Sequence, residues 1–469
     1  MPMTTFDLIT HEKHRTIQIM NAQLNNQTSN QSLLNRSLQS VWHPCTQMKQ
    51  HERLPLIPIK SGEGIWLTGV EGTRYLDAVS SWWVNLFGHN NPRIKDAIKA
   101  QLDTLEHVIL AGFTHEPVVE LSEKLAKLTG LGHAFFASDG ASATEIALKM
   151  SFHYWRNIGF SNKTKFISLQ NSYHGETLGA LSVTDVAIFK DTYAPLLRQS
   201  AQMPSPDFRL AEVGENAEAY ALRCADTLEA YVALHQAELA AFIIEPLVQC
   251  AAGMGMYHPT YLKRAREICT QYKIHLIADE IAVGFGRTGT MFACEQAKVK
   301  PDFICLSKGI TGGYLPLSAV LSTNEIYAAF YDDSTARGFL HSHSYTGNPL
   351  ACSAALATLA IFETDNIIAT NQQKSAYIAA SINSKMQALA NSPIKHLRHT
   401  GMIFAFDVIT QNKHFQQQFY AAALAKGLLL RPIGNTVYFM PPYIINEAEI
   451  DYLVDGALET ILQMTQGAA

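Results

Sequence analysis

The 469-residue sequence has few charged residues: Asp, Glu, Lys and Arg make up 16% of it, and the formal net charge is -5. No large basic surplus marks it as a nucleic-acid-binding protein, and no block of like charge marks a patch for a membrane surface. It also lacks an uninterrupted apolar run long enough to span a bilayer. These absences argue against nucleic acid and membrane as partners.

Cysteine is scarce as well. The seven cysteines are an odd number, scattered without CxxC spacing. This pattern argues against a disulfide framework and a zinc site, and it favours a reducing compartment. The N-terminus has no basic segment followed by an apolar stretch, so we expect no secretory signal and a cytoplasmic protein.

At 47% hydrophobic residues, the chain can bury a large core and is long enough for several domains. Residues 1–39 are polar, with an Asn/Gln/Ser-rich patch, and we expect them to be a disordered or loosely attached extension. Short strands are expected at residues 57–67 and 73–77, where glycines punctuate the turns, followed by helices at residues 92–105 and 116–128.

From His133 onward, apolar runs alternate with helical segments. The expected strands are residues 133–137, 165–169, 240–245, 274–278, 303–306 and 317–322. Thr260 to Tyr272 is the clearest helix, with Thr260 as its N-cap. This alternation indicates an α/β fold with a mainly parallel, doubly wound sheet. A long helix at residues 350–363 and strands at 402–407 and 436–440 indicate a separate α+β part at the carboxyl end.

Two chemically useful residues follow neighbouring apolar runs. Asp279 follows the run that starts at Ile274, and Lys308 follows the run Phe303 to Ser307. Loops at the carboxyl ends of parallel strands line the ligand crevice. Either residue alone reads equally as an ordinary helix cap or a surface lysine. Together they suit pyridoxal phosphate, since the lysine forms a Schiff base with the aldehyde and the carboxylate keeps the pyridine nitrogen protonated.

The string Leu276 to Gly289, followed by Ser307-Lys308-Gly309, resembles the class III aminotransferases, which have fold type I of the pyridoxal phosphate enzymes. The similarity covers nearly all of the chain after about Leu38. It implies a homodimer with two shared active sites, a large cofactor domain at residues 86–348, and a small α+β domain from residues 40–85 and 349–469. It also implies that Lys308 moves the proton as base and acid, while Asp279 stabilises the pyridinium.

The turn Ser138 to Ser142 lies between an expected strand and an expected helix. Free N–H groups and the positive end of the helix dipole suit a phosphate, although an ordinary capped turn has the same pattern. In the family this turn holds the cofactor phosphate, which points to Gly140, Ala141 and Ser142. Since relatives often have Ser at position 141, the contact is expected from Ser142 or from the backbone only.

Three further residues follow expected strands. Tyr173 can stack on the pyridine ring, although a Tyr packed at a loop is the plain alternative. The resemblance favours cofactor roles for Tyr173 and His174, and it places Glu245 near the ring hydroxyl. A buried carboxylate needs a partner, and we expect Arg287 in that role when no substrate carboxylate is bound. Otherwise Glu245 is a strand-terminal residue in water.

The loop His341 to Pro349 corresponds to one that reaches the neighbouring subunit's phosphate in the family, and Ser344 is the hydroxyl expected there. Ser342 of the same loop is expected at the substrate. The two histidines at positions 341 and 343 lack a third convergent ligand, so we expect no metal site.

The substrate is suggested by Trp82 and Trp83, which follow Ser80-Ser81, and by Arg431 and Tyr438. Paired tryptophans often serve core packing, and Arg431 alternatively forms a salt bridge. The Ser-Ser-Trp-Trp string is similar to class members of biotin biosynthesis, in which S-adenosylmethionine donates an amino group to 8-amino-7-oxononanoate. Cys45 stands where such members often have a donor-contacting Tyr. A lysine-using variant, another ω-aminotransferase and a non-catalytic protein of the same fold remain alternatives.

Overall fold

The computed structural model describes residues 33–54, 56–198, 200–387 and 392–466. The chain divides into two compact units, residues 1–61 with 68–74 and residues 62–67 with 75–469. The first unit contains α2 (Leu33–Ser40) and η1 (Met48–Glu52). Most of the predicted extension, residues 1–32, lies outside the described residues. Its end forms α2, in which no residue is buried.

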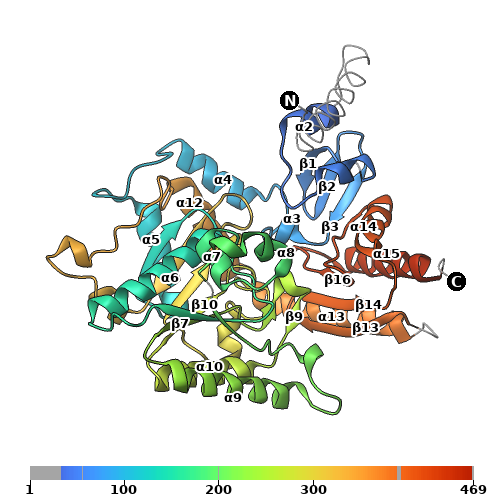
Figure 1. Cartoon of the computed structure of the whole chain (residues 1–469). Coiled ribbons are helices and arrows are strands. Elements are labelled where there is room, and N and C mark those ends of the chain that lie inside the picture. Colours follow the sequence, from blue (N-terminus) through green and yellow to red (C-terminus); the bar gives the residue numbers. More distant parts are fainter. Residues whose placement is uncertain (1–32, 55, 199, 388–391, 467–469) are drawn as a thin grey trace, which may run out of the picture. The chain divides into compact units, whose positions relative to one another are not determined.

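The second unit is built on a seven-stranded sheet in the order β4-β12-β11-β10-β7-β5-β6 (Figure 1). Its strands are β4 (His133–Ala137), β5 (Lys165–Leu169), β6 (Ala201–Met203), β7 (Leu239–Ile244), β10 (His275–Asp279), β11 (Phe303–Leu306) and β12 (Ser318–Ser322). β6, β5, β7, β10 and β11 pair in parallel, whereas β12 is antiparallel to β11 and β4. The predicted mainly parallel sheet is confirmed.

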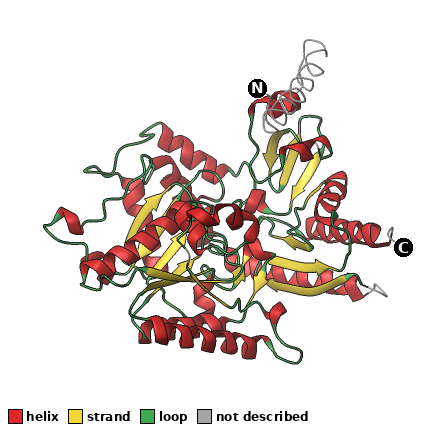
Figure 2. Ribbon diagram, in the orientation of Figure 1, coloured by secondary structure: helices red, strands yellow, loops and turns green. Residues whose placement is uncertain are grey.

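The strands read as continuous apolar runs because both faces of the sheet are covered. Phe242 and Leu276 belong to the core on the side of α9 (Ala217–His235) and α10 (Pro259–Gln271). Their neighbours Ile243 and Ile277 belong to a second core that includes the inner side of α6 (Gly140–Asn157). The helices on either side of the strands are visible in Figure 2.

The N-cap predicted for α10 is wrong. The cap is His258, whose ring accepts the N–H of Thr260, and the helix begins at Pro259. Proline fixes φ near its helical value and needs no hydrogen-bond acceptor at the first helical position, so the helix starts before Thr260.

The parallel strands bring the candidate residues to one edge. β12 is antiparallel to both of its neighbours, so β4 runs in the same direction as β11. The carboxyl ends of β4, β5, β7, β10 and β11 therefore lie at the same edge of the sheet. The segments that follow these strands carry Gly140, Tyr173, Glu245, Asp279 and Lys308.

The carboxyl-terminal part has its own three-stranded antiparallel sheet, β13 (Ile394–Thr400), β14 (Ile403–Val408) and β16 (Thr436–Phe439). The long helix α12 (Pro349–Thr364) precedes it and packs on α4 (Pro92–Leu102) and α5 (Glu116–Thr129). β15 (Leu428–Leu429) pairs in parallel with β3 (Arg74–Asp77), with Leu428 opposite Leu76. This pairing joins a strand near the amino end to a strand near the carboxyl end. It suits the predicted small domain made from both chain ends, which stays a prediction.

The other α-helices and β-strands complete the described part of the chain. They are β1 (Ile59–Glu63), β2 (Trp66–Gly69), α3 (Ser80–Trp83), α7 (Leu178–Val183), α8 (Ala187–Lys190), β8 (Val248–Gln249), β9 (Gly255–Met256), α11 (Asn324–Ala328), α13 (Ile367–Gln387), α14 (Phe415–Ala425) and α15 (Glu447–Gln466). Among the described residues, no single helix is long and apolar enough to cross a membrane. α12 and α13, which meet at a 73° bend, reach that length and apolarity only as a pair.

Candidate active site

Lys308 and Asp279 stand at the ends of adjacent strands. Asp279 is the last residue of β10 and is 4% exposed, and Lys308 begins the short helix η6 (Lys308–Thr311) after β11. Lys308 has a φ of 46°, a left-handed conformation that is strained for a residue with a side chain. Burial lowers the pKa of Lys308, while Cys250, Asp279 and Glu245 act in the opposite direction. An amine with a lowered pKa is well suited to attack a carbonyl carbon.

Asp279 is fixed by buried partners. Its Oδ2 lies 2.7 Å from Nδ1 of His174, and its Oδ1 accepts the N–H of Ile281 at 3.1 Å. His174 is held in turn through its backbone, which donates to Thr184 and accepts from Thr144. Within the described part of the chain, the buried Nε2 of His174 has no hydrogen-bond partner. The pair therefore orients a carboxylate rigidly at the edge of the sheet.

The first turn of α6 offers backbone donors. Asp139 is its N-cap and accepts both the N–H of Ser142 at 2.9 Å and its hydroxyl at 2.8 Å. The Ser142 contact expected for a phosphate is therefore already used, because the cap takes both donors. The N–H groups of Gly140 and Ala141 belong to the part of a helix that has no intrahelical acceptor.

The same turn is closed on one side by a glycine. Gly175 has a φ of 121°, and a Cβ added there would come within 2.6 Å of the Cβ of Ala141. A Cβ at Gly140 would lie 2.9 Å from Ile281. A side chain at either position would therefore clash with a neighbour, so glycine at both positions keeps the start of α6 closely packed.

Glu245 is 5% exposed and is satisfied by the backbone. It accepts the N–H of Tyr173 at 2.9 Å and that of Cys250 at 3.2 Å. Burial raises the pKa of Glu245 to about 7, although the nearby His174 acts to lower it. The partner expected from the sequence was Arg287, and this prediction is wrong. Two N–H donors already meet the carboxylate, so no cation is needed.

Arg287 lies elsewhere, fully buried. Its guanidinium donates to the carbonyls of Pro441 and Asn85, each at 3.0 Å, and stacks 5.0 Å from the ring centre of Tyr443. Burial lowers the pKa of Arg287. The side chain therefore joins the loop after Trp83 to the end of β16, and its predicted substrate contact remains a prediction.

The Tyr173 hydroxyl donates to Glu176 at 2.8 Å, and its ring meets Phe189 edge-on at 5.3 Å. The sequence interpretation missed Glu176. A carboxylate three residues after a site tyrosine, just beyond a strand, is the signal that would have found it.

The paired tryptophans lie in an unusual turn. The four residues Ser80 to Trp83 have φ values of 52°, 46°, 73° and 72°, so α3 is a single left-handed turn. Each L-residue in this conformation costs about 1–2 kcal/mol. The turn must be held by interactions outside it, as strained backbone persists only where its surroundings fix it.

This turn brings the aromatic rings to the other predicted site residues. The Nζ of Lys308 lies 4.8 Å from the ring centre of Trp83, whose indole N–H donates to the hydroxyl of Tyr438 at 3.2 Å. Arg431 lies 5.0 Å above the ring of Trp82, which is 45% exposed. The structure therefore brings together both tryptophans, the reactive lysine, the tyrosine and the arginine.

Ser342 and Ser344 are exposed on the loop before α12, as is Tyr345. In the same loop, the Nε2 atoms of His341 and His343 lie 3.0 Å apart. The ranges that the structure describes contain no group of three or more His, Cys, Asp or Glu side chains that could hold a metal ion.

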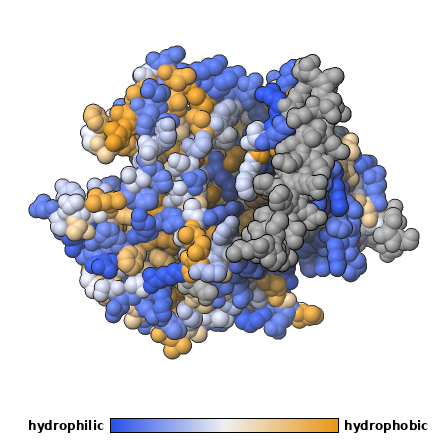
Figure 3. Space-filling model, turned by 45° about the horizontal axis from the view of Figure 1, so that its top comes forward, coloured by the Kyte–Doolittle hydropathy of each residue, from blue (hydrophilic) through white to orange (hydrophobic). Residues whose placement is uncertain are grey.

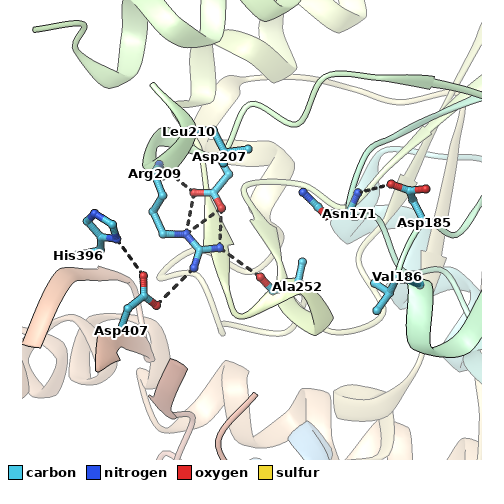
Figure 4. A pocket seen from close by; sticks show the side chains of 10 residues that line it. Asn171, Asp185, Val186, Asp207, Arg209, Leu210, Ala252, His396 and Asp407 are labelled. Carbon is cyan, nitrogen blue, oxygen red and sulfur yellow. Dashed lines mark hydrogen bonds and ion pairs between the residues drawn. The ribbon is translucent and has the colours of Figure 1, made fainter. Parts of the chain in front are cut away.

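A cavity of about 500 Å³, lined in part by charged residues, lies outside this set (Figure 4). Arg209 pairs there with Asp207 at 2.6 Å and with Asp407 at 3.4 Å, and Asp407 also meets His396 at 2.9 Å. The lining residues are Asn171, Asp185, Val186, Ala187, Asp207, Arg209, Leu210, Ala252, His396 and Asp407. None of them is a predicted site residue, and the charges lining the cavity are largely paired with one another.

Comparisons with known proteins agree with this geometry. The chain is 49% identical over 436 residues to the adenosylmethionine-8-amino-7-oxononanoate aminotransferase of Helicobacter pylori, covering 92% of this chain and 98% of that protein. The crystal structure of the protein of the same name from Methanocaldococcus jannaschii matches with a TM-score of 0.86 and 36% identity, covering 92% of this chain and 98% of that one.

A solved amine transaminase from an uncultivated Pseudomonas species, in its PLP-bound form, matches with a TM-score of 0.85 and 32% identity, covering 91% of this chain and 98% of that one. The family model described as "Aminotransferase class-III" matches residues 47–462, which is most of the chain. This protein therefore belongs to the class III aminotransferase family.

Proposed function

We propose that this enzyme transfers the amino group of S-adenosylmethionine to 8-amino-7-oxononanoate, giving 7,8-diaminononanoate for biotin biosynthesis. The observation that carries the proposal is the contact between Lys308 and Trp83, whose ring centre lies 4.8 Å from Nζ. It joins the amine that performs the chemistry to the Ser-Ser-Trp-Trp segment, which is similar to that of biotin-pathway members of the family.

Enzymes of this family use pyridoxal phosphate, and the residues present fit it. The N–H groups of Gly140 and Ala141 at the start of α6 suit the phosphate, and Asp279, oriented by His174, suits a protonated ring nitrogen. Tyr173 and Glu245 would lie at the ring, and Lys308 would hold the aldehyde carbon. The cofactor supplies an electron sink for the carbon that loses its proton.

The residues of the chain then divide the work. With its amine free, Lys308 would take the proton from the substrate carbon as a general base and give a proton back as a general acid. Its lowered pKa favours the neutral amine that this role needs. Asp279 would place its carboxylate beside the ring nitrogen. One pocket serves both substrates in turn, which is a ping-pong mechanism.

The pocket wall suits the acceptor. The rings of Trp82 and Trp83 offer an apolar surface for an aliphatic chain, and Arg431, lying over Trp82, suits a terminal carboxylate through paired hydrogen bonds. Tyr438 fixes the indole of Trp83 by its hydroxyl. Burial raises the pKa of Tyr438 to about 12, so this hydroxyl stays protonated at neutral pH.

We also propose a homodimer that works in the cytoplasm. Large apolar side chains are exposed on two segments that precede α5 and α12: Ile109, Phe113, Leu340 and Tyr345. Apolar patches interrupt the hydrophilic surface on the side of α4 (Figure 3). A second copy would cover them and receive Ser344 at its phosphate. All seven cysteines are free thiols, which suits a reducing compartment.

The experiment is to mix cofactor-loaded protein with S-adenosylmethionine alone and follow the visible absorbance. We expect it to bleach and to recover when 8-amino-7-oxononanoate is added. Lysine and alanine serve as parallel controls. A response to lysine only would identify a lysine-using variant, and a response to alanine with pyruvate would identify a different ω-aminotransferase. No response to any amine would indicate a non-catalytic protein and contradict the proposal.

A further inference from the structure

We propose that Asp77 is a positioning residue that holds the left-handed turn Ser80–Trp83 and thereby sets the aromatic wall of the substrate pocket. The identity of the substrates in this proposal rests on the proposed function. The positioning role itself rests on contacts within the second unit.

The carboxylate of Asp77 is fully buried and accepts three hydrogen bonds. Its Oδ1 accepts the backbone N–H of Ser81 at 2.9 Å, and its Oδ2 accepts the hydroxyl of Ser81 at 2.7 Å. Oδ2 also lies 3.0 Å from Nε2 of His89. Both oxygens therefore bind the second residue of the left-handed turn, and the side chain of His89 completes the set.

His89 is itself held in place. Its backbone exchanges two hydrogen bonds with the backbone of Gly64, and its Nδ1 lies 3.2 Å from Nδ2 of the Asn85 side chain. A Cβ added at Gly62 would come within 2.8 Å of the His89 side chain, so the strand beside it packs directly on the imidazole. Asp77 is therefore bound to a fixed partner on one side and to the strained turn on the other.

The turn has other restraints as well, including the guanidinium of Arg287 on the carbonyl of Trp83 at 3.4 Å and the bond from the Trp83 indole to Tyr438. Its internal bonds join Trp83 to Val79 and Val84 to Ser80, and the hydroxyl of Ser80 donates to the carbonyl of Met440 at 2.7 Å. The internal bonds do not choose a left-handed over a right-handed turn, because both hands allow bonds of this spacing. The bonds from Ser81 to Asp77 are made from outside the turn and favour the hand that is observed.

The conformation of the turn affects the reacting groups through Trp82 and Trp83. Trp82 meets Arg431 and Trp83 meets Lys308, so any relaxation of the turn moves both rings away from these partners. Asp77 thus acts on the reaction by placing the wall, and no contact between Asp77 and Lys308 is needed.

The first variant is Asp77→Asn, which keeps the size of the side chain but replaces one acceptor oxygen by a donor. We expect kcat/KM for 8-amino-7-oxononanoate to fall by about a hundredfold, as small misplacements in a site can do. Asp302→Asn is the matched control. The carboxylate of Asp302 also accepts a backbone N–H, from Leu276, and a guanidinium N–H, from Arg266. It lies at the amino ends of β10 and β11, whereas the active-site residues lie at the carboxyl ends. The control should keep kcat/KM close to wild type.

A second readout needs no substrate. A ring face favours a positive charge beside it, so Trp83 stabilises the protonated form of the Lys308 nitrogen. In cofactor-loaded Asp77→Asn, the pH midpoint of the visible absorbance should fall below that of the wild type and of Asp302→Asn. A shifted midpoint in Asp77→Asn, together with a wild type that does not turn over S-adenosylmethionine, would support the positioning role and reject the proposed function. An unshifted midpoint would overturn the positioning role whatever the substrates are.

The third test separates conformation from charge. Ser81→Gly and Ser81→Ala both remove the hydroxyl bond, but only glycine adopts positive φ freely. Combined with Asp77→Asn, glycine should recover part of kcat/KM and of the midpoint shift, whereas alanine should not. If Asp77→Asn fails to fold, the same pair is compared in the wild-type background, where glycine should retain more activity than alanine. Equal behaviour of glycine and alanine would overturn the proposal.

Discussion

The Nδ1 atom of His174 lies 2.7 Å from Oδ2 of Asp279, and both side chains are almost completely buried. An ionised carboxylate only accepts hydrogen bonds, so His174 donates through Nδ1–H. Since Oδ1 is held by the N–H of Ile281, the carboxylate cannot rotate away from the sheet edge. The arrangement supports a fixed negative charge where the cofactor ring nitrogen would lie.

Asp279→Asn should leave the cofactor bound but nearly stop the reaction. The amide removes the charge that stabilises the protonated ring, so we expect the rate to fall by about a hundredfold to several thousandfold, which corresponds to about 3–5 kcal/mol in the activation free energy. Single-turnover kinetics with S-adenosylmethionine measure this. A rate within about tenfold of wild type would show that Asp279 does not serve the ring nitrogen.

Glu245→Gln should change how stability depends on pH. The pKa of Glu245 rises from 4.5 to about 7 because the group is buried, so the native state holds a proton that the unfolded chain releases in this range. Its contribution to stability is present below pH 4.5 and is lost as pH rises through about 7. The loss is on the order of 3 kcal/mol.

Urea unfolding of the cofactor-free wild type and of Glu245→Gln, from pH 5 to pH 8, checks this. The variant should gain stability relative to the wild type as pH rises, and the difference should level off above about pH 8. A difference that is constant with pH would mean that Glu245 is ionised throughout.

The positions of most strands along the chain and the shared sheet edge were predictable from the sequence, and the physical reason is clear. Strands such as Leu239–Ile244 are buried on both faces, so their apolar runs are unbroken and easy to locate. Residues at the carboxyl ends of parallel strands then meet without any knowledge of the loops, and Asp279 and Lys308 do so.

Contacts that depend on backbone detail could not be predicted. The partners of Glu245 are two backbone N–H groups, which no residue type reveals. The hand of the turn at Trp82 is favoured by the acceptor Asp77, four residues before Ser81, and nothing in Ser-Ser-Trp-Trp itself indicates positive φ. The hydroxyl of Ser142 is taken by its own N-cap, Asp139, a local competition that the motif does not show.

Arg431→Lys should weaken binding of the acceptor selectively. Lysine keeps the charge but loses the paired hydrogen bonds to a carboxylate and the flat contact on Trp82, so KM for 8-amino-7-oxononanoate should rise by about ten- to a hundredfold. Steady-state kinetics with each substrate varied in turn measure this. Equal effects on both substrates would argue that Arg431 shapes the pocket without holding the carboxylate.

Leu340→Asp and Phe113→Asp should disrupt the proposed dimer. These side chains are 80% and 64% exposed, and an unpaired charge at either position would be buried by a second copy. Leu234→Asp is the matched control, since Leu234 is 82% exposed on α9. Light scattering should give the mass of one chain for the first two variants and of two chains for the control. If all three variants have the same mass, this surface is not the interface.

Isotope transfer tests the central claim most directly. The enzyme is given S-adenosylmethionine carrying ¹⁵N in its amino group, together with unlabelled 8-amino-7-oxononanoate, and the 7,8-diaminononanoate formed is weighed by mass spectrometry. We predict a product one mass unit heavier than the unlabelled compound. Product that carries no label, or label that arrives only from ¹⁵N-lysine in a parallel reaction, would contradict S-adenosylmethionine as the donor.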